Sequence, residues 1–171
     1  HGAMTGRMLE SIEGILLEEK PDYVLVYGDT NSTLAGAIAA SKLHIPIAHV
    51  EAGLRSFNMM MPEEINRILT DRVSTVLFCP TINAVKNLED EGYRNFGTKI
   101  INSGDVMYDA ALYYSAKISE SPQKKNEYPE KFVLATIHRE ENLSDKDSLL
   151  SIINALNDIH KNHIPVIFPI H

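Results

Sequence analysis

A stretch of nineteen residues, from His49 to Arg67, concentrates side chains that could carry out proton transfer. It contains three carboxylates and two guanidinium groups: Glu51, Glu63, Glu64, Arg55 and Arg67. Neighbouring acids and partial burial can raise the pKa of a carboxylate until it serves as a general base, and cations can stabilise charge developing on a leaving group. The stretch is therefore a candidate acid–base site.

An ordinary structural explanation exists for part of this stretch. Pro62, followed by Glu63 and Glu64, has the form of a helix start, where acidic side chains complement the helix dipole. Arg67 lies one turn later and could be an i,i+4 partner of Glu63. The spacing alone leaves both explanations open.

Three polar residues directly follow predicted buried strands: Asp29, Glu51 and His138. Ligands of open α/β sheets bind outside the carboxyl ends of the strands. Asp29 could be only a turn residue and His138 an ordinary loop residue. Glu51 is harder to explain in that way, because a carboxylate at the end of a buried strand rarely lacks a partner. The sequence gives no supporting context for His1, His49 and His160.

Runs typical of strands and of helices alternate along the chain. Strands are expected at 23–27, 45–50, 75–79, 99–102, 132–137 and 165–170. Helices are expected at 4–19, 34–41, 63–72, 81–91, 105–118 and 148–160. The continuous apolar run at 23–27 is typical of a parallel strand covered on both faces. The alternation predicts an α/β fold with parallel sheets and right-handed crossovers.

The chain is expected to hold parts of two domains. Residues 119–130 are polar, contain two prolines and show no periodicity, which is typical of a linker. They separate a first domain at 1–118 from a second at 131–171. The first predicted helix has no strand before it, and the sequence stops in the middle of the second α/β pattern. Both domains are therefore expected to be incomplete.

Composition excludes several classes of protein. A formal net charge of −7 and the lack of a basic block argue against nucleic-acid binding. No apolar run approaches the roughly 18 residues of a membrane span, and the first ten residues lack the apolar core of a signal peptide. Cys79, the only cysteine, lies in an apolar run and is expected to be an inert core residue. A cytoplasmic protein without membrane partners is expected.

Known cofactor motifs do not occur in the sequence. It has no cluster with metal-ligand spacing, no Gly-x-Gly-x-x-Gly pattern and no P-loop. It does contain, in this order, GDT, HVEAGLRS, PEEINR, GDVMYDA and HREEN. The joint occurrence of these motifs resembles the non-hydrolysing UDP-N-acetylglucosamine 2-epimerases over essentially the whole chain.

The resemblance implies a fold and a reaction. The fold has two Rossmann-like domains that face each other across a cleft, the glycosyltransferase-B arrangement. The reaction interconverts UDP-N-acetylglucosamine and UDP-N-acetylmannosamine without a metal or nicotinamide cofactor. The C2 proton is removed, UDP is expelled to leave a 2-acetamidoglucal intermediate, and both are then added back. Family members are dimers through the first domain, so a homo-oligomer is implied.

The resemblance also assigns site residues by motif. The family's catalytic acids correspond to Asp29, Glu51 and Glu63, without indicating which acid is the base in each direction. The family's substrate-binding residues correspond to Arg67, His138 and His171. Of these, His138 corresponds to the residue that contacts the UDP moiety.

Two departures from the family pattern qualify the implied activity. Met59 and Met60 stand where the family usually has basic residues, so a role for that charge is in question. The chain also lacks the family's first strand, with its Gly-Thr-Arg-type substrate loop, and everything after His171. We therefore expect the chain alone to be inactive, and expect its uncovered apolar surface to make it self-associate.

Two alternatives to the leading function remain open. One is the hydrolysing relative, which releases UDP and free N-acetylmannosamine; the GDT turn favours the non-hydrolysing branch. The other is a non-catalytic sugar-nucleotide-binding fragment.

Overall fold

The computed structural model describes residues 2–120, 128–137, 145–162 and 164–169. The chain divides into two compact units, His1–Ser115 and Ala116–His171, and each is described by itself. Most of the predicted linker at 119–130 lies outside the described residues.

The first unit is built on a four-stranded sheet whose strands are all parallel and follow one another in sequence order. The strands are β1 (Val24–Tyr27), β2 (Ile47–Val50), β3 (Val76–Cys79) and β4 (Lys99–Asn102). In the register of the sheet, Val26 pairs with His49 and His49 pairs with Leu77. These three side chains therefore lie on one face of the sheet. The predicted parallel α/β architecture is confirmed.

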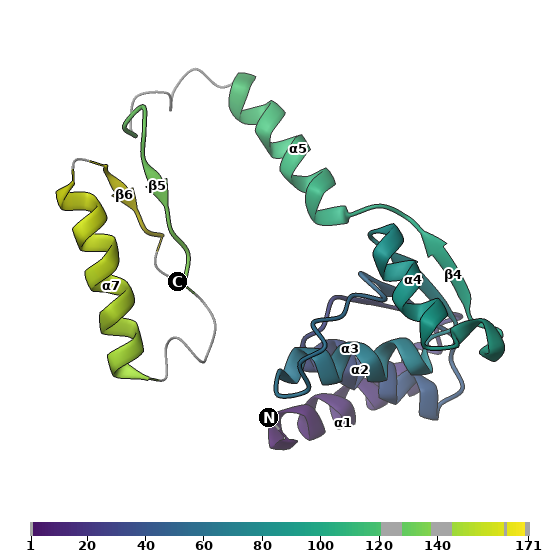
Figure 1. Cartoon of the computed structure of the whole chain (residues 1–171). Helices are drawn as coiled ribbons and strands as arrows, with labels where there is room; N and C mark the ends of the chain where they lie inside the picture. The colour runs from purple at the N-terminus through teal and green to yellow at the C-terminus, as the bar shows by residue number, and fades with distance from the viewer. Residues whose placement is uncertain (1, 121–127, 138–144, 163, 170–171) are drawn as a thin grey trace. The chain divides into compact units, whose positions relative to one another are not determined.

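Helices precede, connect and follow these strands. They are α1 (Gly2–Glu19), α2 (Asn31–Lys42), α3 (Pro62–Val73), α4 (Ile82–Asp90), the 3₁₀ helix η1 (Tyr93–Phe96) and α5 (Val106–Glu120). Helix α2 contacts both α1 and α3, and the three lie side by side in Figure 1. The buried part of α2 consists largely of alanine and glycine, so its backbone can approach its neighbours closely.

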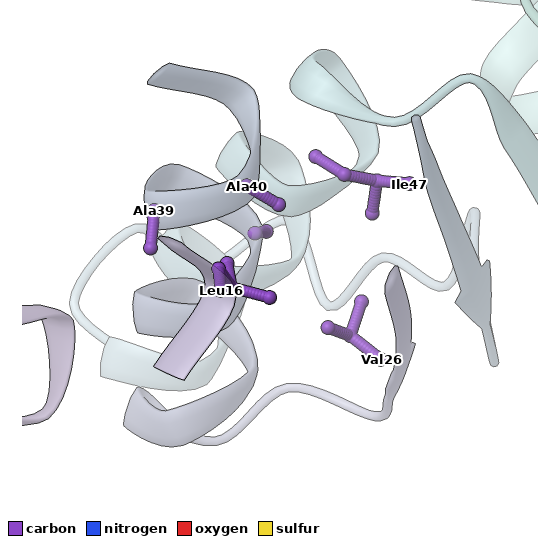
Figure 2. Packing of buried hydrophobic residues seen from close by; sticks show 6 residues of the cluster. Leu16, Val26, Ala39, Ala40 and Ile47 are labelled. Carbon is purple, nitrogen blue, oxygen red and sulfur yellow. The ribbon is translucent and has the colours of Figure 1, made fainter. Parts of the chain in front are cut away.

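Two apolar clusters hold the first unit together. In the first, Leu16 of α1 packs with Ala39 and Ala40 of α2 against Val26 and Ile47 of the sheet (Figure 2). The second lies around α4 and comprises Ala52, Leu77, Cys79, Ala84, Leu88 and Tyr93. Burial raises the pKa of the Cys79 thiol to about 12, so it stays protonated, as expected for a core residue.

The prediction that the first strand is covered on both faces is wrong for the part of the chain that the structure describes. Val26 is buried under the helices, whereas Leu25 and Tyr27 on the opposite face are 50% and 59% exposed. A run that is apolar at every position gives no period-2 signal, so it cannot show that only one face is packed.

The second unit contains a parallel strand pair and a helix. Strand β5 (Val133–Leu134) pairs with β6 (Val166–Ile167), and α7 (Lys146–Lys161) lies between them in the sequence and packs against β6. The N–H of Ser148 donates to the Asp145 carboxylate at 3.0 Å, which caps α7. Both strands are shorter than the predicted runs at 132–137 and 165–170. Within the described residues, no helix is long and apolar enough to cross a membrane.

Candidate acid–base site

The turns that follow β1 and β2 bring Asp29 and Glu51 to the same end of the sheet. Gly28 and Glu51 both have positive φ angles, 63° and 71°, and such a value is unusual for a residue with a side chain. A Cβ atom on Gly28 would lie 3.2 Å from Oε2 of Glu51. The Glu51 carboxylate therefore lies directly against Gly28, the residue before Asp29, in space that a glycine leaves open.

The environment of Glu51 favours its protonated form. Burial raises the pKa of this carboxyl group, and the negative charges of Asp29 and Asp105 raise it further, against the opposing charges of His49 and Arg67. Among the described residues, Glu51 takes part in none of the ion pairs. Asp105, which follows β4, was not proposed from the sequence as a site residue.

Arg67 connects two other carboxylates of this region. It donates to Oδ2 of Asp29 from Nε and Nη2, at 3.0 and 2.8 Å, and its Nη1 bonds Glu64. The Nδ2 amide group of Asn66 donates to the main-chain carbonyl of Asp29 at 2.8 Å. Asp29 is thus held through both its side chain and its backbone by α3. The sequence left open a pair between Arg67 and Glu63; the structure pairs Arg67 with Glu64 instead.

Glu64 is a buried anchor for the loop that precedes α3. Its two oxygens accept the N–H groups of Ser56 and Phe57, each at 2.9 Å. Burial alone would raise the pKa of Glu64, but these two N–H groups and Arg67 outweigh it and lower the pKa. Glu64 therefore remains ionised and organises the loop.

The side chain of Glu63 lies in a different environment from that of Glu64. It is exposed and lines a cavity of about 300 Å³ together with Asp29. The walls of this cavity come from the starts of α1, α2 and α3: Met4, Met8, Asp29, Thr30, Asn31, Ser32, Pro62, Glu63 and Asn66. The structure thus brings Asp29 close to Glu51 on one side and to Glu63 on the other.

A buried charged network behind the site was missed in the sequence. His49 lies with Nδ1 2.7 Å from Oδ1 of Asp71, and Oδ2 of Asp71 accepts from Nη1 of Arg55 at 2.7 Å. Arg55 also donates to both oxygens of Glu91, at 2.7 and 2.8 Å. Burial would lower the pKa of Arg55, but its bonds to Glu91 and Asp71 outweigh this and raise it, so the guanidinium stays charged.

The sequence of helix α3 contains no signal that could have revealed Asp71, because the burial of its polar face depends on packing. Its buried residues are the polar side chains Glu64, Asn66, Thr70 and Asp71, whereas Ile65 and Leu69 are 41% and 43% exposed. A helix that buries its polar face is the reverse of the usual amphipathic pattern. That reversal indicates a polar site beneath the helix.

Two of the proposed substrate-binding residues, His138 and His171, lie outside the described residues. Met59 and Met60 are exposed in the loop before α3. In the part of the chain that the structure describes, no group of three or more His, Cys, Asp or Glu side chains is arranged to hold a metal ion.

Comparisons with known proteins give matches over the whole chain. A family model described as UDP-N-acetylglucosamine 2-epimerase matches residues 1–171. The UDP-2,3-diacetamido-2,3-dideoxy-D-glucuronate 2-epimerase of Pseudomonas aeruginosa is 59% identical over 171 residues, and the UDP-N-acetylglucosamine 2-epimerase of Methanococcus maripaludis is 47% identical over 178 residues. Both alignments cover 100% of this chain and 48% of the relative, so the chain spans about half of their length.

A solved structure is also similar throughout. The crystal structure of Methanocaldococcus jannaschii UDP-GlcNAc 2-epimerase in complex with UDP-GlcNAc and UDP superimposes with a TM-score of 0.90 at 47% identity. The match covers 100% of this chain and 48% of that one.

Proposed function

Because this chain belongs to the UDP-N-acetylglucosamine 2-epimerase family, we propose that the intact protein inverts C2 of a UDP-linked 2-acetamido sugar. The leading substrate pair is UDP-N-acetylglucosamine and UDP-N-acetylmannosamine, interconverted without hydrolysis. The protein is then an isomerase whose chemistry consists of proton transfer and reversible loss of UDP.

The proposed reaction balances without water or a redox cofactor. A carboxylate accepts the C2 proton, the electrons of the C2–H bond form a C1=C2 double bond, and the C1–O bond breaks to release UDP. The product of this step is the 2-acetamidoglucal. Delivery of a proton to the opposite face of C2 and addition of the UDP oxygen to C1 then complete the inversion.

The observation that carries this proposal is the environment of Glu51. A general base is most effective when its pKa approaches the working pH. Glu51 belongs to none of the ion pairs among the described residues, and its pKa is raised by burial and by the charges of Asp29 and Asp105. We assign Glu51 to removal of the C2 proton, and we assign Asp29 and Glu63 to the remaining acid–base steps.

The substrate-binding assignments complete the proposed site. Arg67 keeps a positive charge beside Asp29, where it can offset negative charge that develops as UDP departs. His138 and His171 are assigned to contacts with the nucleotide sugar on motif resemblance alone.

Deuterium incorporation tests this function. The intact protein is incubated with UDP-N-acetylglucosamine in D₂O, and the products are followed by NMR and mass spectrometry. We expect UDP-N-acetylmannosamine carrying deuterium at C2, with no build-up of free UDP. Retention of the C2 proton in the product contradicts the mechanism, and release of UDP with free N-acetylmannosamine assigns the protein to the hydrolysing alternative.

A second candidate substrate is UDP-2,3-diacetamido-2,3-dideoxy-D-glucuronate. It is favoured by the higher identity to the relative named for that sugar, 59% against 47% for the relative named for UDP-N-acetylglucosamine. Measuring kcat/KM for both nucleotide sugars with the same preparation distinguishes them. A ratio above about 10⁴ for either sugar would identify it as the substrate, since a site built to hydrogen-bond a polar substituent rejects analogues lacking it by about 10⁴–10⁵.

The 171-residue chain requires a separate assay, because it spans about half the length of its relatives. We expect it to show no turnover on its own. Turnover by this chain would contradict that expectation and also the alternative of a non-catalytic binding fragment.

A further inference from the structure

Both ring nitrogens of the fully buried His49 face oxygen atoms of the first unit. Nε2 lies 2.8 Å from the carbonyl oxygen of Gly28, and Nδ1 lies 2.7 Å from Oδ1 of Asp71. The His49 side chain therefore spans from the turn after β1 to helix α3.

The contacts of His49 and Asp71 determine which atoms of these two side chains carry protons. A carbonyl oxygen can only accept, so Nε2 of His49 must donate to Gly28. The other Asp71 oxygen, Oδ2, accepts from the N–H of Gly53 at 3.1 Å and from the charged Arg55, the arrangement of a carboxylate in an ion pair. An ionised carboxylate also only accepts, so Nδ1 must donate as well. This donor pattern is that of an imidazolium, which makes the two side chains an ion pair.

The pair reaches the backbone on either side of the two candidate carboxylates. His49 holds the carbonyl of Gly28, the residue before Asp29, and Asp71 holds the N–H of Gly53, two residues after Glu51. Glu51 has a φ of 71°, a left-handed conformation that is unfavourable for a residue other than glycine. That conformation persists only where surrounding contacts impose it.

We propose that the His49–Asp71 ion pair is a positioning device that fixes the turns carrying Asp29 and Glu51 relative to each other. Both side chains are buried and act through the backbone, so they are positioning residues. The catalytic consequence rests on the proposed function, whereas the geometry and protonation of the pair do not.

The charges around the pair support a dedicated role. His49, Asp71, Arg55 and Glu91 alternate in sign, so each buried charge has an opposite neighbour. A buried ion pair is weak evidence for stability, since apolar residues of similar volume often serve equally well. The ion pair does more than an apolar pair could, because it also hydrogen-bonds the carbonyl of Gly28 and the N–H of Gly53. An apolar pair would leave both main-chain groups without these partners.

Kinetics of His49→Gln in the intact protein test the catalytic consequence. We expect kcat to fall about 10- to 100-fold with KM changed less than about threefold, because small misplacement of reacting groups slows chemistry more than binding. Leu16→Ala is the matched control: it removes a buried side chain from the first apolar cluster, which contains none of the turn residues that the pair holds, and lowers stability. Equal effects of the two variants on kcat, at equal loss of Tm, would overturn the proposal.

A double variant separates positioning from general weakening. If His49 and Asp71 act as one unit, His49→Gln/Asp71→Asn should have a kcat no more than about twofold below that of the more impaired single variant, because effects within a unit are not additive. Multiplicative losses would show that the two residues act separately.

NMR provides a readout that does not depend on activity. In the ¹⁵N-histidine-labelled chain, the His49 signals, assigned by their loss in His49→Gln, should show a proton on both ring nitrogens at neutral pH. The titration of the Glu51 carboxyl carbon should move to higher pH in His49→Gln, because a cation that lowers its pKa is removed, and should be unchanged in Leu16→Ala. An unprotonated ring nitrogen, or an unmoved Glu51 titration, would refute the proposal even if no epimerase activity were found.

Discussion

Arg67 directs two hydrogen bonds at a single oxygen of Asp29, from Nε at 3.0 Å and from Nη2 at 2.8 Å. Its third nitrogen bonds Glu64. One guanidinium therefore pairs with two carboxylates, and the neighbouring Glu51 has no ion-pair partner among the described residues. This division separates the ion-paired acids Asp29 and Glu64 from Glu51, the acid assigned to removal of the C2 proton.

Arg67→Met should lower both stability and kcat. It leaves Asp29 and the buried Glu64 without their shared partner, which is expected to reduce the free energy of unfolding by about 1–3 kcal/mol. Arg94→Met is the control, since Arg94 forms an exposed pair with Glu89 and should cost less than about 1 kcal/mol. Urea unfolding of both variants checks the difference, and equal losses would contradict the role given to Arg67.

Glu51 and Glu64 should affect stability with opposite signs. The raised pKa of Glu51 means that the folded state binds its proton more tightly than the unfolded state does, so its ionisation destabilises the fold as pH rises. The lowered pKa of Glu64 gives stability above its unfolded pKa, and this stability is lost as pH falls through the folded pKa.

At about pH 7, Glu51→Gln should therefore raise the free energy of unfolding, and Glu64→Gln should lower it by about 1–3 kcal/mol. At about pH 3, where both carboxyl groups approach their protonated forms, both differences should shrink. Urea unfolding at the two pH values measures this, and a destabilising Glu51→Gln at neutral pH would contradict the assignment.

Gly53→Ala should destabilise the protein far more than Gly97→Ala. Both glycines have positive φ angles, 77° and 73°, so the conformational cost of adding a side chain, about 1–2 kcal/mol, is the same at both positions. A Cβ on Gly53 would also collide with the backbone of Ala84, whose carbonyl carbon would lie 2.9 Å away, whereas nothing lies within 4 Å of one on Gly97. A further loss of about 1–3 kcal/mol is expected for Gly53→Ala. Equal Tm values would contradict this packing.

The 171-residue chain should self-associate through the open face of its sheet. Leu25 and Tyr27 expose apolar surface there, and such patches promote association. Leu25→Lys should raise the monomer fraction measured by light scattering, whereas Leu17→Lys, at an exposed position on α1, should not. A monomeric wild-type chain at micromolar concentration would contradict the prediction.

The order of strands and helices could be predicted from the sequence because it is encoded locally. Apolar runs at 23–27 and 45–50 contain β1 and β2, and Gly92 marks the end of α4 as expected. Asp29 and Glu51 were found because both follow a strand. Their proximity then follows from parallel pairing of adjacent strands.

The buried network could not be predicted in the same way because its partners are distant in sequence. His49 and Asp71 are 22 residues apart, and neither is remarkable within its own element. Glu63 and Glu64 are adjacent and chemically alike. Glu64 is buried and Glu63 is exposed only because of the rotation of α3 about its own axis, which is the phase of the helix. That phase depends on how α3 packs, which the spacing of charged residues did not reveal.

The left-handed backbone of Glu51 has a consequence for laboratory evolution of this protein. At φ 71° glycine is the least strained residue, and a glycine at this position would also remove a carboxylate whose ionisation opposes folding. Selection of variant libraries for heat resistance alone should therefore enrich Glu51→Gly, whereas selection for turnover should restore glutamate. The two selection regimes are therefore expected to favour different residues at position 51.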